Sequence, residues 1–520
     1  MRFLNLIALT ALVVTAACNG NKSSNKGDSQ TAEDSVTTAT EAAREVKPLP
    51  DTVLPSAENV KFSVETVNTE VSGKLCSLTD LYAETPGAFT FRKGSMRQAD
   101  FGGHVQGTPS EIVVDWEFHT ESSPTWGSAT GWTGQPLYVE WPDSMVTAFR
   151  QAGVVNENFS PKEIIVGSLA GYVYFINFET GKRSRTAVDV FNPIKGTLSL
   201  DPTLNGNLYV GQGIAQHRPF GSLVVDLFDN KVTDTFGEDP KAGRHWGAYD
   251  SSPVRVGQFL FRPGENGTLY KFTVSRGKQK LHSALRYTVK GSAPGMEASM
   301  GVYANYGFVA DNAGNILGVN LDTMKPVWYY DLGDDTDASL VVCVEKGHPY
   351  IYVGCEIDKQ NVGTGNFVKL DAVNGSEIWK LKVPGRLATV GEKHFDGGFY
   401  ATALPGLGNC EDLLFVNVVY NEKGQNGAFM AIKKESGEIA YTSPLARYSW
   451  SSPVGFLNEK NEYFVATGDG AGNMYVFNGR DGKELVRKNI AHNFESSPVV
   501  VGNSLVVGSR GSCIFKMTIK

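Results

Sequence analysis

A short motif that recurs eight times constrains the fold of this chain more than any other feature. In each copy a Gly opens a short strand of alternating residues that often ends in Asn or Asp and a second turn. The copies begin at Gly171, Gly221, Gly267, Gly314, Gly365, Gly427, Gly472 and Gly511, with successive spacings of 50, 46, 47, 51, 62, 45 and 39 residues. Gly suits the positive φ of a tight hairpin turn, and period-two alternation is typical of a strand with one buried face. The repetition indicates one structural unit used eight times.

Further strands accompany each hairpin. Small residues begin an inner strand at SSPTW (Ser122), SSPVR (Ser251), ASMGV (Ala298), ASLVV (Ala338), SSPVG (Ser451) and SSPVV (Ser496). A second strand follows, as in NLYVG (Asn207), and an outer strand comes after the hairpin, as in EIWKLKV (Glu377). Four strands per repeat of about 45 residues predict one blade of a β-propeller.

The end of the last repeat predicts how the ring closes. The eighth copy stops at Lys520, after its third strand, and EIVVDWEFHT (Glu111–Thr120) has the pattern of the missing outer strand. Pairing this segment with Cys513–Thr518 would leave no open sheet edge. We therefore predict an all-β fold, an eight-bladed β-propeller closed by an N-terminal strand that completes the last blade.

The N-terminal residues predict export rather than structure. Residues 1–17 carry Arg2 and a short apolar run, as in a cleaved signal peptide, and Cys18 follows small residues as in a bacterial lipobox. The expected Leu three residues before Cys18 is Thr15, so an ordinary secretory signal is the alternative. Residues 18–47 are polar and predict a flexible tether. We expect a pre-propeller segment at 48–110 and the propeller at 111–520.

Composition excludes two classes of function. The net charge is −7 and the sequence contains no block of Lys and Arg, which argues against a nucleic-acid partner. After the signal peptide no long apolar run follows, which argues against a polytopic membrane protein.

The repeats resemble those of a known family. The segment NFVKLDAVNGSEIWKLK (366–382), with Asp371, Gly375 and Trp379, resembles the pyrroloquinoline-quinone (PQQ) repeat of eight-bladed quinoprotein alcohol dehydrogenase-like propellers. The docking Trp is kept at Trp328 and Trp379 and replaced elsewhere. The resemblance implies the propeller fold over about residues 90–520, and it leaves activity open because many such propellers bind no quinone.

The motifs expected of an enzyme are missing from the sequence. Quinoprotein dehydrogenases carry adjacent cysteines, whereas no two of the six Cys are adjacent here, and no CxxCH haem site is present. The eight His show no metal-binding spacing, and no GxSxG or Walker A motif occurs. Asp469 and Asn473 sit where a hairpin turn needs such residues for its backbone. We expect no cofactor and free thiols at most cysteines, with PQQ and Ca²⁺ as alternatives.

One group of residues suggests a binding site. The residue before each small-residue motif is Glu121, Asp250, Glu297, Asp337 and Glu495, with Trp450 in the seventh repeat. We expect these residues to ring one mouth of the central channel, near aromatic and His residues at Trp126, Trp132, His119, His245, Trp246, Tyr249, Tyr448 and Phe494. Such a ring suits a cation, a basic ligand or a saccharide. Alternatively, each carboxylate caps backbone groups of its own strand.

These features together favour a non-enzymatic binding or scaffold propeller in a bacterial envelope, resembling the BamB family of barrel-assembly lipoproteins. Its partners would be envelope proteins, or a small-molecule or saccharide ligand. The alternatives are a receptor or a quinone-dependent dehydrogenase that uses the central funnel. Asn19 after the lipidated Cys favours the outer membrane, on its periplasmic face or at the cell surface.

Overall fold

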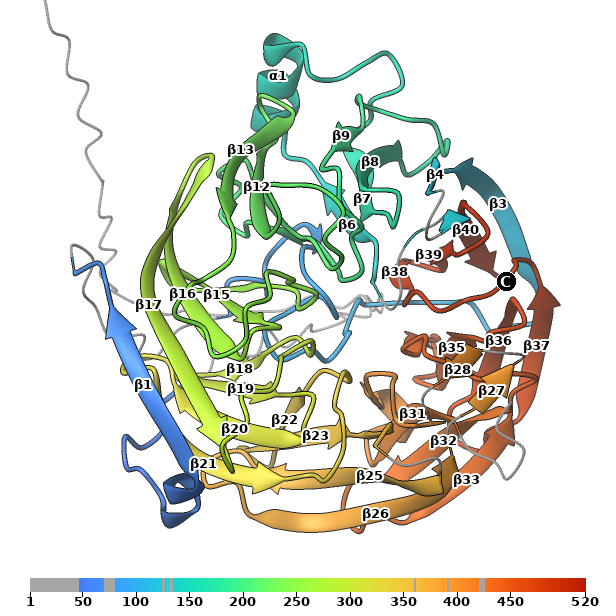
Figure 1. Ribbon diagram of the computed structural model, residues 1–520. Helices are drawn as coiled ribbons and strands as arrows, with labels where there is room; N and C mark the ends of the chain where they lie inside the picture. Colours follow the sequence, from blue (N-terminus) through green and yellow to red (C-terminus); the bar gives the residue numbers. More distant parts are fainter. Residues whose placement is uncertain are drawn as a thin grey trace, which may run out of the picture. The chain divides into compact units, whose positions relative to one another are not determined.

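A ring of eight antiparallel sheets makes up the folded body (Figure 1). The computed structural model describes residues 46–520 except 70–79, 124–126, 129, 131–133, 360–361, 387, 391–392, 396 and 420–425. The sheets follow one another around the ring in chain order, which confirms the predicted all-β, eight-bladed propeller.

Each blade runs from an inner to an outer strand. Blade 1 holds β2 (Gly87–Ala88), β6 (Leu137–Glu140), β7 (Lys162–Gly167), β8 (Tyr172–Asn177) and β9 (Val188–Asp189). Blade 2 holds β10 (Ser199–Leu200), β11 (Asn207–Gly211), β12 (Ser222–Asp226) and β13 (Lys231–Phe236). Blade 3 holds β14 (Val254–Val256), β15 (Phe259–Gly264), β16 (Thr268–Ser275), β17 (Lys278–Val289) and, at its outer edge, β1 (Val60–Thr66). Blade 4 holds β18 (Gly301–Tyr303), β19 (Tyr306–Ala310), β20 (Asn315–Asn320) and β21 (Lys325–Asp331).

The other four blades follow the same plan. Blade 5 holds β22 (Val341–Glu345), β23 (His348–Gly354), β25 (Val362–Asp371) and β26 (Glu377–Arg386). Blade 6 holds β24 (Glu356–Ile357), β29 (Gly397–Gly398), β30 (Leu404–Pro405), β31 (Leu413–Val419), β32 (Gly427–Lys433) and β33 (Ile439–Pro444). Blade 7 holds β34 (Val454–Leu457), β35 (Tyr463–Gly468), β36 (Asn473–Asn478) and β37 (Glu484–Asn489). Blade 8 holds β38 (Val499–Val501), β39 (Ser504–Ser509), β40 (Cys513–Ile519) and β3 (Ile112–His119).

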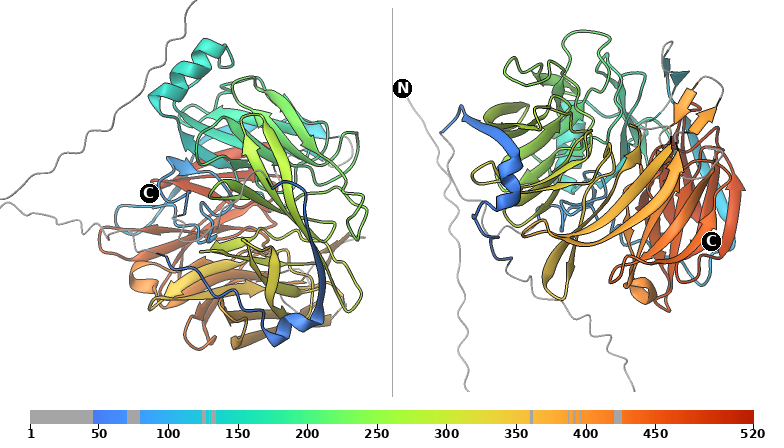
Figure 2. Two further views of the ribbon diagram at one scale, coloured as in Figure 1. Left: turned by 90° about the vertical axis from the view of Figure 1, so that its left-hand side faces the viewer. Right: turned by 60° about the horizontal axis from the view of Figure 1, so that its bottom comes forward.

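A few elements lie outside this plan. The short strands β4 (Ser122–Ser123) and β5 (Gly127–Ser128) pair with each other, as do β27 (Ala388–Val390) and β28 (Lys393–Phe395). The 3-10 turns η1 (Pro55–Asn59) and η2 (Gly408–Cys410) are short, and the helix α1 (Asp143–Ala152) projects from blade 1 (Figure 2). None of the helices within the described residues is long and apolar enough to span a bilayer.

The ring closes as the sequence predicts. Strand β3 pairs antiparallel with β40, from Ile112 opposite Ile519 to His119 opposite Cys513. The amide of Glu111 also donates to the Lys520 carbonyl oxygen at 3.0 Å. This pairing covers the outer edge of β40, which would otherwise be open.

Neighbouring blades are locked by an aromatic residue that packs on a glycine. In blade 4, Trp328 donates its indole N–H to the Ala372 carbonyl of blade 5 at 3.1 Å, and its ring packs on Gly375. Gly375 has φ +72°, and a Cβ there would lie 2.5 Å from the indole, so the position requires Gly. The closing strand makes the same kind of contact: the indole N–H of Trp116 in β3 donates to the Phe178 carbonyl of blade 1 at 2.9 Å.

The small-residue motifs build a chain of hydroxyls around the channel. In blades 2 to 8 a Ser or Thr stands two residues after the residue that precedes the motif, and six of these hydroxyls accept the backbone N–H of the equivalent residue in the preceding blade. These bonds are Gln135–Thr197 at 2.6 Å, Ser252–Ser299 at 2.9 Å, Ser299–Ser339 at 2.9 Å, Ser339–Thr402 at 3.0 Å, Thr402–Ser452 at 3.0 Å and Ser452–Ser497 at 3.1 Å. The Ser and Thr of the motif therefore connect blades as well as fitting a crowded centre.

The structure corrects the sequence prediction for the first repeat. SSPTW does not begin an inner strand, because Ser122 and Ser123 pair with β5 instead. Strand β6 is preceded by Gly134, Gln135 and Pro136, which take the place of the small-residue motif in blade 1.

A segment at residues 87–105, which we call the plug, fills the centre of the ring (blue in Figure 1). It hydrogen-bonds to all eight blades: to Val139, Leu200, Ser252, Val302, Val342, Ala403, Pro453 and Gly502. Arg92 and Arg97 are fully buried, and their guanidinium groups donate to backbone carbonyls such as those of Pro453 (2.7 Å) and Met300 (2.9 Å). Burial lowers the pKa of Arg92 to about 9 and that of Arg97 to about 10.

Candidate functional site

One position in each repeat faces the mouth of the channel. It is the residue directly before the small-residue motif, and in blades 2 to 8 it is occupied by Lys195, Asp250, Glu297, Asp337, Tyr400, Trp450 and Glu495. The sequence prediction included five of these seven. It missed Lys195 and Tyr400 because their motifs, KGTLS and YATAL, have lost the Ser-Ser-Pro pattern.

The first acidic triad is built around a lysine. Carboxylate oxygens of Asp250, Glu265 and Glu297 all lie within 4.8 Å of one another. Lys195 Nζ forms an ion pair with Asp250 and lies 3.1 Å from Glu297 Oε2. Glu265 enters from the β15–β16 turn and also accepts the indole N–H of Trp246 at 2.9 Å.

Burial and charge set the protonation of this triad. Burial raises the pKa of Asp250 and that of Glu265, and the neighbouring carboxylates add to both shifts. Burial opposes ionisation of Glu297 too, but the Lys195 ammonium outweighs it and holds the pKa of Glu297 below its usual value. Burial also works against the charge on Lys195, yet Asp250 and Glu297 raise the pKa of Lys195 well above its usual value. Lys195 therefore supplies a built-in cation for this triad.

The second acidic triad has no such lysine. Asp335, Asp337 and Glu356 place carboxylate oxygens within 4.8 Å of one another. Asn312 joins the two triads, since its Nδ2 donates to Glu297 Oε1 at 3.1 Å and to Asp335 Oδ2 at 3.4 Å. Burial raises the pKa of Asp335 to about 7 and that of Asp337 well above its usual value.

Several oxygens at the second triad are buried without a hydrogen bond. Asp335 Oδ1, Asp337 Oδ1 and Asn312 Oδ1 have no partner among the described residues. A buried acceptor left in this state costs about 1–3 kcal/mol, and more if it is charged. Among the described residues no ammonium or guanidinium group forms an ion pair with Asp335 or Asp337, although the charge of Lys195 opposes the rise in the pKa of Asp337.

The two triads border a small cavity at the mouth. Its lining includes Lys195, Asp250, Glu297 and Asp337, and Lys195 is the only cationic side chain among the described lining residues. Hydroxyls of the inter-blade chain, including Ser299 and Ser339, line the rest. The cavity measures about 40 Å³, which suffices for an ion or a few waters.

Aromatic side chains continue the ring beyond the acids. Tyr400 stacks on Trp450 with ring centres 4.8 Å apart, and Trp450 contacts Tyr448 at 5.0 Å. The Tyr448 hydroxyl donates to Glu495 Oε1 at 2.8 Å, and Arg510 lies 3.3 Å from Glu495 Oε2. Burial raises the pKa of Glu495, although Arg510 opposes the shift. Glu495 therefore belongs to the ring but already has its own cation.

The remaining predicted residues lie in other settings. Glu121 does not line the cavity and instead binds Arg183 (3.1 Å) and the Tyr174 hydroxyl. His245 is exposed, Trp246 is half-buried, and Tyr249 and Phe494 are core residues. Trp126 and Trp132, like Cys18, lie outside the described residues.

Two other sequence predictions concern turns and thiols. Asp469 Oδ1 accepts the backbone N–H groups of Ala471 at 2.9 Å and Asn473 at 3.0 Å, which confirms its backbone role. The four cysteines of the described chain are buried free thiols, as expected: Cys343, Cys355, Cys410 and Cys513.

Comparison with known proteins bears on the fold. No protein-family profile and no curated protein sequence matches this chain. Among solved structures, a europium-containing methanol dehydrogenase has a TM-score of 0.56 at 12% identity and covers 84% of this chain and 99% of its own. The quinohemoprotein alcohol dehydrogenase from Comamonas testosteroni has a TM-score of 0.56 at 14% identity, covering 84% of this chain and 81% of its own. BamB from Moraxella catarrhalis has a TM-score of 0.46 at 14% identity, covering 68% and 93%. The two dehydrogenases therefore share the fold of this chain.

PQQ and Ca²⁺ are the two bound groups left open by the sequence. The described residues at the mouth fit only one of them. PQQ is a flat tricarboxylate, whereas six carboxylates and one lysine surround this mouth, and pockets for such ligands usually measure about 300 Å³ or more. The described residues therefore do not fit PQQ. Asp335, Asp337, Glu356 and Asn312 present carboxylate and amide oxygens, which are the donors that Ca²⁺ prefers. These residues fit a calcium ion.

Proposed function

We propose that this chain is a non-enzymatic binding propeller of the bacterial envelope, anchored by a lipid on Cys18, with Ca²⁺ held at its central mouth. The observation that supports this function is the second acidic triad. It concentrates three carboxylates and an amide oxygen, and within the described chain no ammonium or guanidinium group forms an ion pair with Asp335 or Asp337. The adjacent triad, with Lys195 at its centre, shows how the same chain neutralises such a cluster when it provides its own cation.

Calcium chemistry agrees with the size and donors of the site. Ca²⁺ takes six to eight oxygens, including waters, and tolerates irregular geometry. Oxygens of Asp335, Asp337, Glu356 and Asn312 would hold it, and waters in the cavity would complete its shell. An ion at the mouth would also offer open positions to carboxylate or hydroxyl groups of a ligand. This suits the two partner classes predicted from the sequence, envelope proteins and saccharides.

Calorimetric titration of the chelator-treated protein with Ca²⁺ tests the ion. We expect Ca²⁺ to bind and to raise the thermal unfolding temperature, because an ion that binds only the folded state stabilises it. The double variant Asp335→Asn/Asp337→Asn should weaken binding by at least about tenfold, because it removes two charges from the site. Without Ca²⁺ the same variant should be more stable than the wild type, because it replaces two buried carboxyl groups, whose ionisation is opposed by burial, with neutral amides.

Glu121→Gln is the matched control, because Glu121 lies outside the cavity and should leave Ca²⁺ binding unchanged. Absence of Ca²⁺ binding to the wild type, or equal binding to the double variant, would contradict the proposed site. Dye-linked alcohol oxidation after addition of PQQ and Ca²⁺ would contradict the non-enzymatic part of the proposal.

The same preparations distinguish the partner classes. A thermal shift with a saccharide panel that requires Ca²⁺ and is lost in Asp335→Asn/Asp337→Asn would assign a saccharide. Calcium-dependent co-purification of one envelope protein with the lipidated chain, lost in the same variant, would assign a protein partner.

A further inference from the structure

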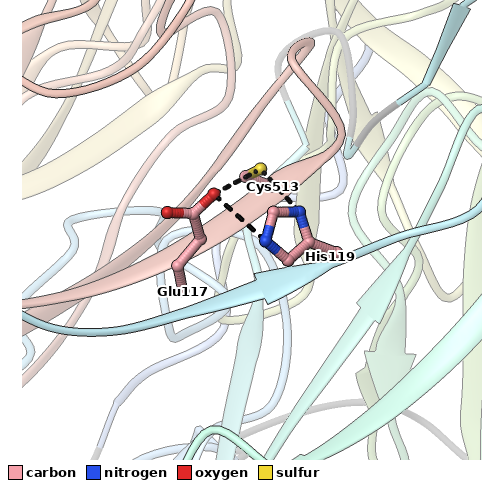
Figure 3. A group of neighbouring side chains, drawn as sticks. All are labelled: Glu117, His119 and Cys513. Carbon is pink, nitrogen blue, oxygen red and sulfur yellow. Dashed lines mark hydrogen bonds and ion pairs between the residues drawn. The ribbon is translucent and has the colours of Figure 1, made fainter.

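A second group of metal-binding side chains lies far from the mouth, on the strands that close the ring (Figure 3). Glu117 and His119 are two residues apart on β3, so both project from the same face of the strand. Cys513 begins β40 and lies directly opposite His119 in the register. Side chains of directly opposed residues share a face, and therefore the thiol, the imidazole and the carboxylate meet.

The distances between the ligand atoms are short. Cys513 Sγ donates to Glu117 Oε1 at 2.9 Å and lies 3.4 Å from His119 Nδ1. His119 Nε2 lies 3.5 Å from Glu117 Oε1. In a tetrahedral zinc site, ligand atoms bound at about 2.0–2.3 Å lie about 3.5 Å from one another. Zinc would bind only one ring nitrogen of His119. The Sγ–Nδ1 separation already has this value, and the Sγ–Oε1 separation would open when zinc replaces the thiol proton. The Glu117 carboxylate would leave Nε2 and bind the ion beside Nδ1, a small movement because one ligand atom from each residue already lies within 4.8 Å of the others.

We propose that Glu117, His119 and Cys513 bind Zn²⁺. Sulfur, imidazole nitrogen and carboxylate oxygen are the three donor types that zinc accepts in proteins. The side chains of His119 and Glu117 are 76% and 42% exposed, so an ion can enter from solvent and water can take the fourth position. Ca²⁺ and Mg²⁺ are disfavoured at this site because they select oxygen donors.

Zinc at this position would stabilise the pairing of β3 with β40 that closes the ring. His119 and Cys513 are 394 residues apart in the sequence and belong to the two strands whose pairing completes blade 8. An ion that joins them would connect the two ends of the propeller, and cross-links that close long loops restrict the unfolded chain most. The proposal is independent of the calcium site, which uses other residues.

Cobalt substitution tests the site directly. Adding Co²⁺ to the metal-free full chain should produce a thiolate-to-cobalt charge-transfer band, and Zn²⁺ should abolish the band by displacement. Cys513→Ser should lack the band. His119→Asn changes a side chain that is mostly exposed, and it should weaken binding at least about tenfold. Zn²⁺ should raise the unfolding temperature of the wild type and of neither variant.

Cys410→Ser is the matched control, because Cys410 is also a buried free thiol and its sulfur contacts the side chain of Asn409. This variant should keep the cobalt band. A wild type without the band, or a band that persists in Cys513→Ser, would overturn the proposal. If Cys513→Ser fails to fold, the affinity of His119→Asn decides the question, and unchanged affinity would overturn the proposal.

Discussion

Individual hydroxyls connect neighbouring blades at the centre of this propeller. Ser452 accepts the backbone N–H of Thr402 at 3.0 Å, and its own N–H donates to Ser497 at 3.1 Å. Each such bond satisfies a backbone N–H that is buried where the blades converge. An unsatisfied N–H there would cost about 1–3 kcal/mol. Small polar residues are therefore favoured at these positions for an energetic as well as a steric reason.

Two adjacent serines in blade 7 test this account. Ser452→Ala should lower the free energy of unfolding by about 1–3 kcal/mol, because it leaves the Thr402 N–H without its acceptor. Ser451→Ala is the control, because the Ser451 hydroxyl is buried with no partner among the described residues and should be neutral or stabilising when removed. Denaturant unfolding of both variants provides the measurement. Equal losses would show that crowding alone explains the motif.

Only some residues of the candidate site could be predicted from the sequence. Asp250, Glu297 and Asp337 were predicted because each precedes a recognisable small-residue motif. Asn312 and Glu265 lie in turns between strands, and their approach to the mouth depends on blade packing that no local pattern records. Glu121 precedes SSPTW, a motif that in this blade does not start an inner strand, and the prediction therefore misplaced it.

Among the elements, β40 and β1 differ sharply in how many partners they have. Strand β40 lies between β39 and β3 and carries Phe515 and Met517 into the core. Strand β1 pairs only with β17, at the outer edge of blade 3, where Glu65 binds Arg286 at 2.8 Å. The two strands therefore contribute differently to the integrity of the ring.

Two deletions measure this difference. Removing residues 513–520 should abolish cooperative unfolding, because it strips two ladders and exposes the edges of both neighbours. Removing 46–66 should lower the unfolding temperature but preserve one cooperative transition. Near-ultraviolet circular dichroism during heating measures both. A cooperative, wild-type-like transition in the first variant would show that the ring does not depend on its closing strand.

Elements that follow the repeat were predictable, and those that interrupt it were not. The strands β11, β21, β26 and β3 were expected from alternation, and the last three also from their Trp residues. The plug has no such periodicity, since its backbone is irregular and includes positive φ at Arg92, Lys93, Arg97 and Ala99. Its place was determined by the hollow that eight converging blades leave, which is a tertiary effect.

For the whole molecule, the proposed lipid anchor would determine where the propeller works. We expect Cys18→Ser to abolish metabolic labelling with a fatty acid and to release the protein from the membrane fraction, because one residue supplies the proposed attachment. Fractionation of cells that produce each form provides the measurement. The folded body should be unaffected, with an unchanged unfolding temperature. Membrane association that survives in the variant would indicate a different anchor.

The fold was predictable from the sequence because its information is repeated eight times, so that errors in single repeats, such as the first, do not change the count. The chemistry of the site is not repeated. It depends on differences between blades, such as Lys195 in blade 2 and Tyr400 in blade 6, where other blades carry acids. Averaging over repeats reveals the scaffold and hides these differences.

The plug also determines how early the propeller can complete its folding during synthesis. Residues 87–105 are synthesised before every blade residue that receives their hydrogen bonds, and the last of those partners, Gly502, is made only after the strands of blades 1 to 7. A partly synthesised chain therefore lacks some of the blades that bind the plug, and its centre cannot yet be complete. Assembly becomes a single late event, which is compatible with threading the polypeptide through a secretion channel before it settles.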